Sequence, residues 1–430
     1  MEKYVEYKDS GIPWIGNIPA HWSIQRGKNV LILLDRPVNQ NDEVITCFRD
    51  GEVTLRKNRR EDGFTVSLQE IGYQGVEPGD LVVHGMDGFA GSIGISDSRG
   101  KATPVLNVMD SLHNKRFLMY YLRMAAYKDV FMSLSTGIRV RSCDLRWNKL
   151  SIFPFVLPNP NEQDQIVNYI DENLKKIDTI IAEAKASIEE YKAWKASIIY
   201  EAITKGLDPD VEMKDSGVEW IGNMPTTWNA CALKQLTTKI GSGKTPSGGA
   251  EVYTTEGVMF LRSQNVYNTG LELDSVSFIS EEIDESMANT RVQYQDVLLN
   301  ITGGSIGRCC LYDLEDIPAN VNQHVCILRT DKTKLLPQFL RYFWNSASGP
   351  MVVAQHQTGG NRQGLNFEQI GSTKIPYCSI EEQKKIVTFL DNRCQSIDML
   401  INEKEALISD LESYKKSLIF EVVTGKRRVC

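Results

Sequence analysis

The chain of 430 residues contains the same motif twice, and this duplication limits the possible folds more than any other feature. Residues 8–22, KDSGIPWIGNIPAHW, return as residues 214–228, KDSGVEWIGNMPTTW, with 10 of 15 positions identical at an offset of 206. A second match runs without a gap from Glu162 and Glu382 to Thr204 and Thr424, at an offset of 220. This period is far longer than a solenoid unit. The sequence therefore predicts two tandem halves, each with a short motif, a globular region and a long helix.

The segments between the matches have the pattern of mixed α and β domains. Residues 23–150 and 229–376 contain apolar, strand-like runs separated by glycines, such as residues 80–84 and 296–301. Short helical pieces such as residues 117–126 lie between these runs. The two segments differ from each other except at small islands of identity. We therefore expect one fold that carries two different surfaces.

Each half ends in a long helix with a heptad pattern. Apolar residues recur every seven positions from Ile170 to Ile198, with a second row four positions later, as in the a/d seam of a coiled coil. The second copy repeats the pattern, with lysines on the seam at Lys404 and Lys415. At ~1.5 Å per residue the matched segment is roughly 65 Å long, close to two turns of B-DNA. We expect the helices to pack antiparallel and to act as a spacer; in the alternative, each packs only on its own domain.

The predicted fold class is α+β, with two tandem mixed α/β domains, two long antiparallel helices that form a coiled coil, and a pseudo-two-fold internal repeat. The predicted boundaries are residues 1–158 for the first globular domain, 159–206 for the central helix, 207–377 for the second globular domain and 378–430 for the C-terminal helix.

Composition narrows the class of protein. The longest apolar runs, such as residues 30–34, are far shorter than the ~20 residues that cross a bilayer, which argues against a membrane protein. The first residues lack the apolar stretch of a secretory signal, and the nine cysteines contain no CxxC pair, so we expect a reducing cytoplasm. A net charge of −7 argues against unspecific coating of nucleic acid but leaves specific binding open.

The motifs of common catalytic sites are incomplete. Residues 241–245, GSGKT, resemble the end of a P-loop, but Thr238 stands where that motif needs glycine. The five histidines show no zinc-ligand spacing, and neither a GxSxG elbow nor a papain-like cysteine signature is present. Asn159-Pro160-Asn161 is not the catalytic loop of an adenine methyltransferase. We therefore predict no catalytic residues and no metal site in this chain.

Several loops combine basic and amide side chains, which suit the recognition of phosphates and base edges. Arginine pairs with guanine, and asparagine or glutamine pairs with adenine, in the major groove. Each single residue could also be an ordinary solvated surface residue, but the segments after Thr136-Gly137 and Thr358-Gly359 correspond between the halves. The candidate DNA contacts are Lys57, Arg59, Arg60, Arg139 and Arg141 in the first domain, and Lys244, Thr245, Ser247, Arg262, Gln264, Asn265, Arg308, Asn361, Arg362 and Gln363 in the second.

Taken together, the motifs resemble the specificity subunit of a Type I restriction-modification system over nearly the whole chain. The resemblance rests on the doubled KDSGxxWIGxxPxxW motif, on the loops at residues 241–247, 303–307 and 322–325, and on the Glu-Gln helix starts. The first domain departs from the pattern, because residues 34–38 replace the GKTPS loop. The resemblance implies two target recognition domains, each reading one half of a split, asymmetric DNA site, with the helices as the spacer between them.

The resemblance also implies partners. Members of the family are not enzymes by themselves; they bind two modification subunits, which methylate adenine with S-adenosylmethionine, and two restriction subunits, which use ATP and Mg and cut DNA. No cofactor is expected on this chain. By analogy the long helices dock the modification subunits, and the candidate partner-binding residues are Ile177, Ile181, Ile188, Trp194, Ile397, Ile401, Ile408 and Tyr414.

Two other classes of protein remain as alternatives. A stand-alone nuclease or methyltransferase with an unrecognised site would turn over DNA as the purified chain. A coiled-coil scaffold that binds only proteins would show no sequence-selective DNA binding, even together with modification subunits.

Overall fold

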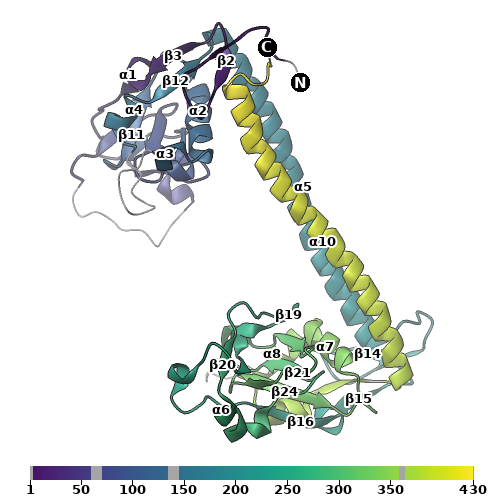
Figure 1. Cartoon of the computed structure of the whole chain (residues 1–430). Helices are drawn as coiled ribbons and strands as arrows, with labels where there is room; N and C mark the ends of the chain where they lie inside the picture. Colours follow the sequence, from purple (N-terminus) through teal and green to yellow (C-terminus); the bar gives the residue numbers. More distant parts are fainter. Residues whose placement is uncertain (1–2, 60–69, 134–144, 358–363, 430) are drawn as a thin grey trace. The chain divides into compact units, whose positions relative to one another are not determined.

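The computed structural model describes residues 3–59, 70–133, 145–357 and 364–429. The chain forms two compact units (Figure 1): the first contains residues 1–185 and 405–430, and the second contains residues 186–404. Helix α5 (Pro160–Lys205) begins in the first unit and ends in the second, whereas α10 (Ile380–Val423) runs from the second to the first. Each unit therefore contains one globular part and one segment of each long helix.

The globular part of the first unit is built on a small antiparallel sheet. Its strand order is β4-β11-β8-β9, formed by Ile32–Leu33, Leu106–Asp110, Leu81–His84 and Ile93–Ile95. Four two-stranded pairs complete the strands: β1 (Tyr7–Asp9) with β2 (Asn17–Pro19), β3 (Ser23–Arg26) with β12 (Pro154–Leu157), β5 (Ile45–Cys47) with β6 (Val53–Leu55), and β7 (Gln74–Val76) with β10 (Gly100–Ala102). The helices are α1 (Gly27–Val30), α2 (Lys115–Tyr127), α3 (Val130–Ser133) and α4 (Trp147–Leu150), with 3-10 turns at Arg56–Asn58 and Gly88–Ala90.

The second unit repeats this plan. Its four-stranded antiparallel sheet has the order β16-β24-β21-β22, formed by Thr237–Ser242, Val325–Thr330, Val297–Asn300 and Cys309–Leu311. The pair β13 (Met213–Asp215) and β14 (Asn223–Pro225) corresponds to β1 and β2, and the pair β15 (Asn229–Ala232) and β25 (Lys374–Tyr377) corresponds to β3 and β12. The prediction of one fold used twice is thus confirmed at the level of strand order.

The second unit also has elements of its own. A three-stranded sheet has the order β20-β17-β23, formed by Ser277–Ile279, Val258–Leu261 and Ala319–Val321, and a short pair joins β18 (Val266–Tyr267) to β19 (Gly270–Leu271). The helices are α6 (Glu281–Ser286), α7 (Pro337–Asn345), α8 (Ser348–His356) and α9 (Phe367–Ser372). Short 3-10 turns lie at Leu233–Gln235, Gly249–Val252, Ser263–Asn265, Ala288–Thr290 and Gly303–Ser305.

The repeated Glu-Gln pair explains how each long helix starts on its own domain. The Gln163 amide accepts a hydrogen bond from the Asn114 backbone and donates to the Pro158 carbonyl. Gln383 repeats both contacts with the Leu336 and Cys378 backbones. Both glutamines are fully buried, where an unpaired amide would be costly. The repeated glutamine therefore fixes the start of each long helix to the domain that precedes it.

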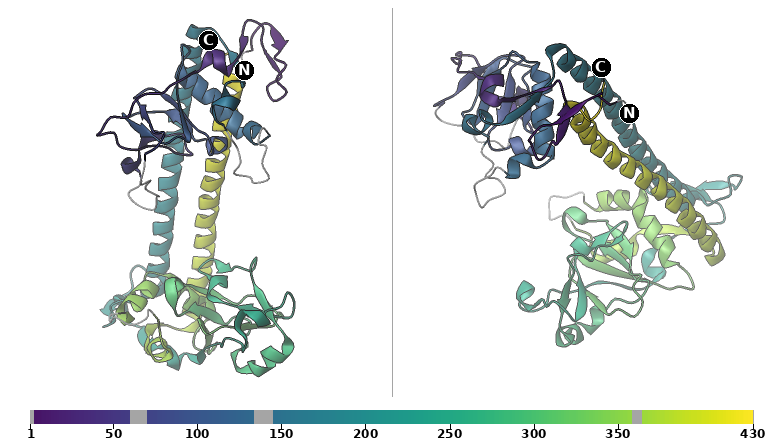
Figure 2. Two further views of the ribbon diagram at one scale, coloured as in Figure 1. Left: turned by 90° about the vertical axis from the view of Figure 1, so that its left-hand side faces the viewer. Right: turned by 45° about the horizontal axis from the view of Figure 1, so that its top comes forward.

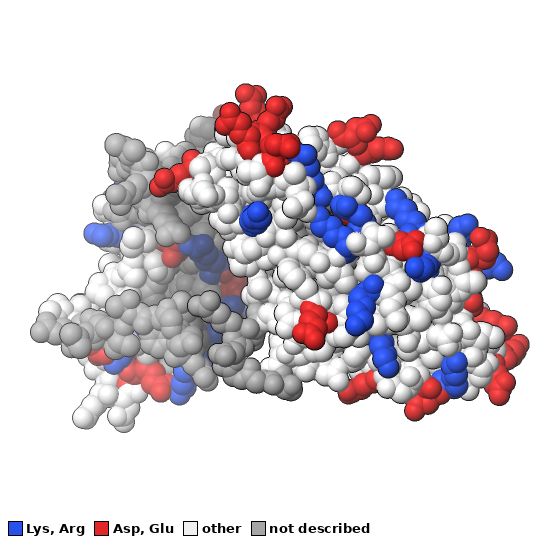
Figure 3. All heavy atoms as spheres, turned by 90° about the horizontal axis from the view of Figure 1, so that it is seen from below, with Lys and Arg blue, Asp and Glu red and all other residues white. Residues whose placement is uncertain are grey.

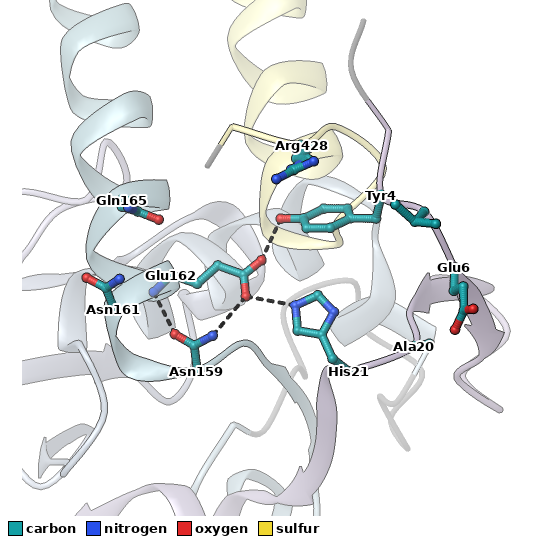
Figure 4. A pocket seen from close by; sticks show the side chains of 10 residues that line it. Tyr4, Glu6, Ala20, His21, Asn159, Asn161, Glu162, Gln165 and Arg428 are labelled. Carbon is teal, nitrogen blue, oxygen red and sulfur yellow. Dashed lines mark hydrogen bonds and ion pairs between the residues drawn. The ribbon is translucent and has the colours of Figure 1, made fainter.

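The repeated tryptophan motif closes around the same helix start. In the first unit Trp22 is completely buried and donates from Nε1 to Glu162 Oε1 at 3.0 Å. Tyr4 and His21 reach the same carboxylate, at 2.7 and 3.0 Å (Figure 4). Burial by itself would raise the pKa of Glu162, but these three hydrogen bonds lower it below its ordinary value. Glu162 is thus a buried charged anchor for the N-terminal motif.

The two long helices run antiparallel in each unit and lie side by side in every view (Figures 1 and 2). In the first unit Tyr169 contacts Arg427, just after the end of α10, and Asp178 pairs with Lys415 of α10, so the residue number falls along this segment as it rises on α5. In the second unit Lys195 pairs with Asp398. Most of the apolar seam residues between them are buried, and the others are partly buried. The predicted antiparallel coiled coil is confirmed. Among the described residues, none of the helices is sufficiently long and apolar to cross a membrane.

Candidate nucleic-acid interface

Loops from four parts of the second unit meet at one place. The Thr245 hydroxyl hydrogen-bonds the side-chain oxygen of Gln323. The ring of His324 contacts the Gln323 side chain at 2.9 Å and the Thr302 hydroxyl at 2.6 Å. The Thr302 backbone also forms an isolated antiparallel β-bridge with Gly364. Side chains from the loop after β16, the loop after β21 and the turn before β24 are therefore held together. We call Thr245, Thr302, Gln323 and His324 the loop cluster.

Local backbone constraints give the loop cluster its shape. Gly243 packs so closely that a Cβ there would overlap the Val321 carbonyl, so the loop after β16 must pass this point as glycine. Gly303 has φ +72°, in the left-handed region. Asn322 is buried, and its side-chain oxygen accepts the His324 amide at 3.0 Å. This Asn turn presents Gln323 and His324 at the surface.

The predicted residues of the GKTPS loop lie beside this cluster. Lys244, Thr245 and Ser247 are all exposed, and Thr245 belongs to the cluster itself. An exposed lysine with neighbouring hydroxyls is suited to phosphate contact. The Gly-Lys-Thr pattern in the sequence therefore identified surface residues. The structure places these residues next to the turn at residues 322–324.

Three other predicted DNA contacts of the second domain, Arg262, Gln264 and Arg308, have no contact with the loop cluster among the hydrogen bonds given above. The Arg262 guanidinium lies 5.3 Å from the Tyr253 ring, and Gln264 is exposed. The Arg308 guanidinium lies 4.5 Å above the Tyr267 ring and borders a cavity of about 300 Å³. Both arginines are half-buried and oriented by an aromatic ring.

Asn265 has a structural role in this fold. It is completely buried, its side-chain oxygen accepts the Arg262 amide at 3.0 Å, and its Nδ2 donates to the Glu272 carbonyl at 2.8 Å. The side chain therefore closes the turn at Ser263–Asn265, and its hydrogen-bonding groups are used within the chain. Sequence alone does not distinguish an amide that closes a turn from one that faces DNA.

The predicted contacts of the first domain that the structure describes are paired with carboxylates. Lys57 pairs with Glu43 at 2.5 Å, and Arg59 pairs with Asp50 at 2.6 Å and with Glu52 at 2.8 Å. These pairs lie at the surface, where each contributes little stability. Arg60, Arg139 and Arg141 lie outside the described residues, as do Asn361, Arg362 and Gln363 in the second domain.

The predicted DNA contacts did not include four residues of this surface: Thr302, Gln323, His324 and Tyr267. The segments 303–307 and 322–325 stood out in the sequence as family motifs, but nothing there indicated that their side chains would meet. The pairing of Thr245 with Gln323 joins residues 78 positions apart, which only the sheet order brings together.

Charge alone does not mark an interface. Figure 3 shows one face of the molecule on which lysine and arginine side chains gather, with aspartate and glutamate side chains among and around them. Within the described ranges, no group of histidine, cysteine, aspartate and glutamate side chains could hold a metal ion. Burial raises the pKa of the Cys47 and Cys310 thiols to about 12, which leaves both thiols protonated.

The predicted partner-binding residues fall into two groups. Ile177, Ile181, Ile188, Ile397 and Ile401 are buried, and Ile408 packs against the core of the first unit. Trp194 and Tyr414 are instead 49% and 44% exposed. Most of the heptad residues therefore stabilise the chain itself, and only the last two offer surface to another protein.

The comparisons with known proteins agree with this architecture. Residues 225–409 match the family model of the Type I restriction modification DNA specificity domain. The chain is 25% identical over 361 residues to the Type I restriction enzyme EcoBI specificity subunit of Escherichia coli, covering 82% of this chain and 74% of that protein. It is 27% identical over 347 residues to the MjaVIII specificity subunit of Methanocaldococcus jannaschii, covering 79% and 76%.

Solved structures share the fold. One, from work on complex assembly and conformational transition of the type I R-M system, has a TM-score of 0.73 at 12% identity and covers 95% of this chain and 99% of its own. The HsdS subunit from Thermoanaerobacter tengcongensis has a TM-score of 0.54 at 13% identity and covers 95% and 98%. Residues 225–409 thus match a Type I restriction modification DNA specificity domain, and the chain as a whole is similar in sequence and in fold to Type I restriction enzyme specificity subunits.

Proposed function

We propose that this chain selects the DNA sequence for a Type I restriction-modification complex, with each globular domain binding one half of a bipartite, asymmetric site. The observation that carries the proposal is the duplicated sheet order combined with unlike loops. A single fold presented twice suits two half-sites on one duplex, and different loops suit half-sites of different sequence. A DNA recognition subunit needs no catalytic residues of its own.

In the second domain the readout surface is the loop cluster together with its exposed neighbours. Gln323 and His324 present hydrogen-bonding groups from a turn whose shape Asn322 fixes, which is the preorganisation that base recognition needs. Lys244 and Ser247 supply phosphate contacts. Arg262, Gln264 and Arg308, together with Asn361, Arg362 and Gln363, extend the surface; Asn265 is assigned to support of the turn.

In the first domain the two described candidates, Lys57 and Arg59, are less suited to readout. Lys57 and Arg59 would have to exchange a carboxylate for a phosphate, which reduces the gain from each contact. We assign the base contacts to Arg60, Arg139 and Arg141.

The helices are proposed to fix the half-site spacing and to dock two modification subunits. If Ile177 and Ile397 are heptad positions d, and Ile181 and Ile401 positions a, the e and g positions flank the seam on opposite edges. In each unit the globular part docks on an e position: Arg116 pairs with Asp171 at 2.7 Å, and the Tyr342 hydroxyl bonds Asp391 at 2.6 Å.

Several g positions carry large apolar side chains that are exposed, and four of them form two matched pairs. In the first unit these are Ile180 and Tyr414, and in the second Leu400 and Trp194, between 38% and 49% exposed. The offset of 220 relates Ile180 to Leu400 and Trp194 to Tyr414. Because antiparallel pairing brings the g positions of both helices to one edge of the seam, each unit has one such apolar patch. Two equivalent patches fit two copies of one partner.

The remaining chemistry is assigned to the partners. S-adenosylmethionine is expected on the modification subunits, and ATP and Mg on two restriction subunits. The proposal places the complex in the cytoplasm on double-stranded DNA.

The test is sequencing of adenine methylation in cells that produce this chain with its modification subunit, compared with cells that lack only this chain. A split motif seen only when the chain is present would support the proposal and reveal target and spacer. A soluble complex with an active methyltransferase and no such motif would overturn it in favour of a protein-binding scaffold.

A further inference from the structure

A small cavity in the first unit lies between the end of α2 and the last third of α10. It has a volume of about 190 Å³ and is lined by Met124, Tyr127, Lys128, Ser413, Lys416, Ser417 and Phe420. Two ammonium groups and two serine hydroxyl groups, with the Tyr127 side chain, thus surround one space. Among the described residues, no carboxylate lines it.

The two lysines are held by aromatic rings and not by acids. Lys128 Nζ lies 4.6 Å from the centre of the Phe420 ring, and Lys416 Nζ lies 5.7 Å from that of Tyr127. Within the described part of the chain neither lysine has an ion-pair partner. A cation–π contact orients an ammonium group without neutralising its charge. Both charges therefore remain available to an anion.

One neighbouring arginine adds a further cation, whereas Glu412 lines the adjacent pocket that shares Tyr127 and Lys416. The Arg123 guanidinium donates to the Tyr127 hydroxyl, at 3.0 Å from Nε and 2.7 Å from Nη2, and lies 5.7 Å from the Tyr127 ring. Ser413 and Ser417 lie one helical turn apart on α10, so both hydroxyls face the same side. Ammonium and hydroxyl donors around one cavity are the groups that bind phosphate oxygens.

The second unit does not repeat this arrangement. At the offset of 220, Ala193 and Ala196 stand where the first unit has Ser413 and Lys416. The repeated helices keep apolar residues at most seam positions, yet this face differs. A purely structural requirement shared by both helices therefore does not account for the lysine and the serine.

We propose that this cavity, the α2–α10 site formed by Lys128, Ser413, Lys416 and Ser417, binds a backbone phosphate of the DNA held by the complex. The inference rests on the proposed function, since it adds a contact to the same duplex. It gives the first unit a phosphate contact made by unpaired cations, whereas Lys57 and Arg59 in its loops are paired with carboxylates. The contact carries no base information, so it adds affinity and positioning only.

The test uses the complete complex of this chain with its modification subunit and a duplex containing its methylation target. The variant is K128Q/K416Q, and the matched control is R26Q/K28Q, which removes two exposed cations of the same unit far from the cavity in sequence. Fluorescence anisotropy measures the dissociation constant as a function of salt. The slope of log K against log salt should fall by ~0.9 in the variant, the value for one lost phosphate contact, and should fall by less in the control.

The same titration with a scrambled duplex separates the possible failures. The variant should keep its ratio of specific to unspecific affinity, because only a backbone contact is lost. An unchanged slope with intact specific binding overturns the α2–α10 site while leaving the proposed function in place. Loss of the modification subunit from the variant complex also overturns it, because the lysines would then contact a protein. Absence of specific binding in the unmodified complex would instead contradict the proposed function.

Discussion

Lys195 of α5 pairs with Asp398 of α10 at 2.6 Å, and the residues 220 positions away, Lys415 and Asp178, form the same pair at 2.5 Å with the helices exchanged. A contact that recurs with its two partners exchanged is the mark of an isologous, two-fold related interface. The duplicated helices thus pair as two copies of one sequence would in a symmetric dimer. This relationship sets the register of the coiled coil inside a single chain.

The register pair gives a first prediction. K195A and D178A should each lower stability by no more than about 1 kcal/mol, because one or both partners of each pair are well exposed. The charge exchange K195D/D398K should restore most of the loss, and the like-charge variant K195D should lose more than K195A. Thermal unfolding of the four variants measures the effect. Equal melting temperatures for K195D and K195D/D398K would show that the pair does not set the register.

A second prediction concerns acid stability. Because hydrogen bonds from Tyr4, His21 and Trp22 lower the pKa of Glu162, its carboxylate stabilises the fold above the unfolded value of about 4.3 and loses this contribution as pH falls through the lower folded pKa. E162Q should cost about 1 to 3 kcal/mol at pH 7 and flatten the pH dependence in that acid window.

The matched control for E162Q is E382Q at the second helix start. There Asp210 and Thr227 replace Tyr4 and His21, so the same substitution removes fewer hydrogen bonds. Denaturant unfolding from pH 3 to pH 7 compares the two. A similar loss in both variants would mean that the charge at the helix start, and not the Tyr4–His21–Trp22 contacts, stabilises this region.

A third prediction tests the helices as a spacer. Seven residues inserted into α5 alone should destabilise the chain, because they displace Lys195 from Asp398 or Asp178 from Lys415. Seven residues inserted into both helices at equivalent positions keep the register and lengthen the pair by roughly 10 Å, or about three base pairs. Methylation sequencing should then find the same half-sites with a longer spacer; an unchanged spacer would reject the role.

A fourth prediction addresses base readout. Q323A and H324A should weaken recognition of one half-site only, by about 1 to 3 kcal/mol for a lost base contact. N265A should instead lower thermal stability, since that side chain closes a turn. Methylation of duplexes with single changes in each half-site distinguishes these outcomes. Equal weakening at both half-sites by Q323A would indicate misfolding and would argue against readout by this turn.

A fifth prediction concerns partner docking. I180E and L400E, which correspond at the offset of 220, should each lose one modification subunit, and the double variant should lose both. A182E adds the same charge at another exposed position of α5 and is the control. Native mass spectrometry of the complex counts the subunits. Full occupancy in I180E/L400E would exclude these patches as the docking surface.

The sequence supported the architecture in detail where a repeat or a period could be seen. The doubled motif predicted two domains of one fold, and the heptads predicted the antiparallel helices; strand order and the Lys195–Asp398 and Asp178–Lys415 pairs agree with both. The sequence also identified the GKTPS loop as a candidate, because a lysine and several hydroxyl residues stand between glycines in one short segment. In the structure Lys244, Thr245 and Ser247 are exposed.

The tertiary structure decided whether each candidate side chain is exposed and free to bind another molecule. Asn265 and Gln264 are adjacent amides, yet the first is buried in a turn and the second is exposed. The sequence predicted Arg59 as a DNA contact, but in the structure it pairs with Asp50 and Glu52. It predicted Ile181 as a partner contact, but in the structure Ile181 is buried. The sequence by itself determined the repeat, the long helices and their antiparallel pairing, because these depend on repeated and periodic local patterns. Only the tertiary structure decided which candidate residues are exposed and which are already paired, because those contacts, from the turn at Asn265 to the ion pairs of Arg59, follow no periodic pattern.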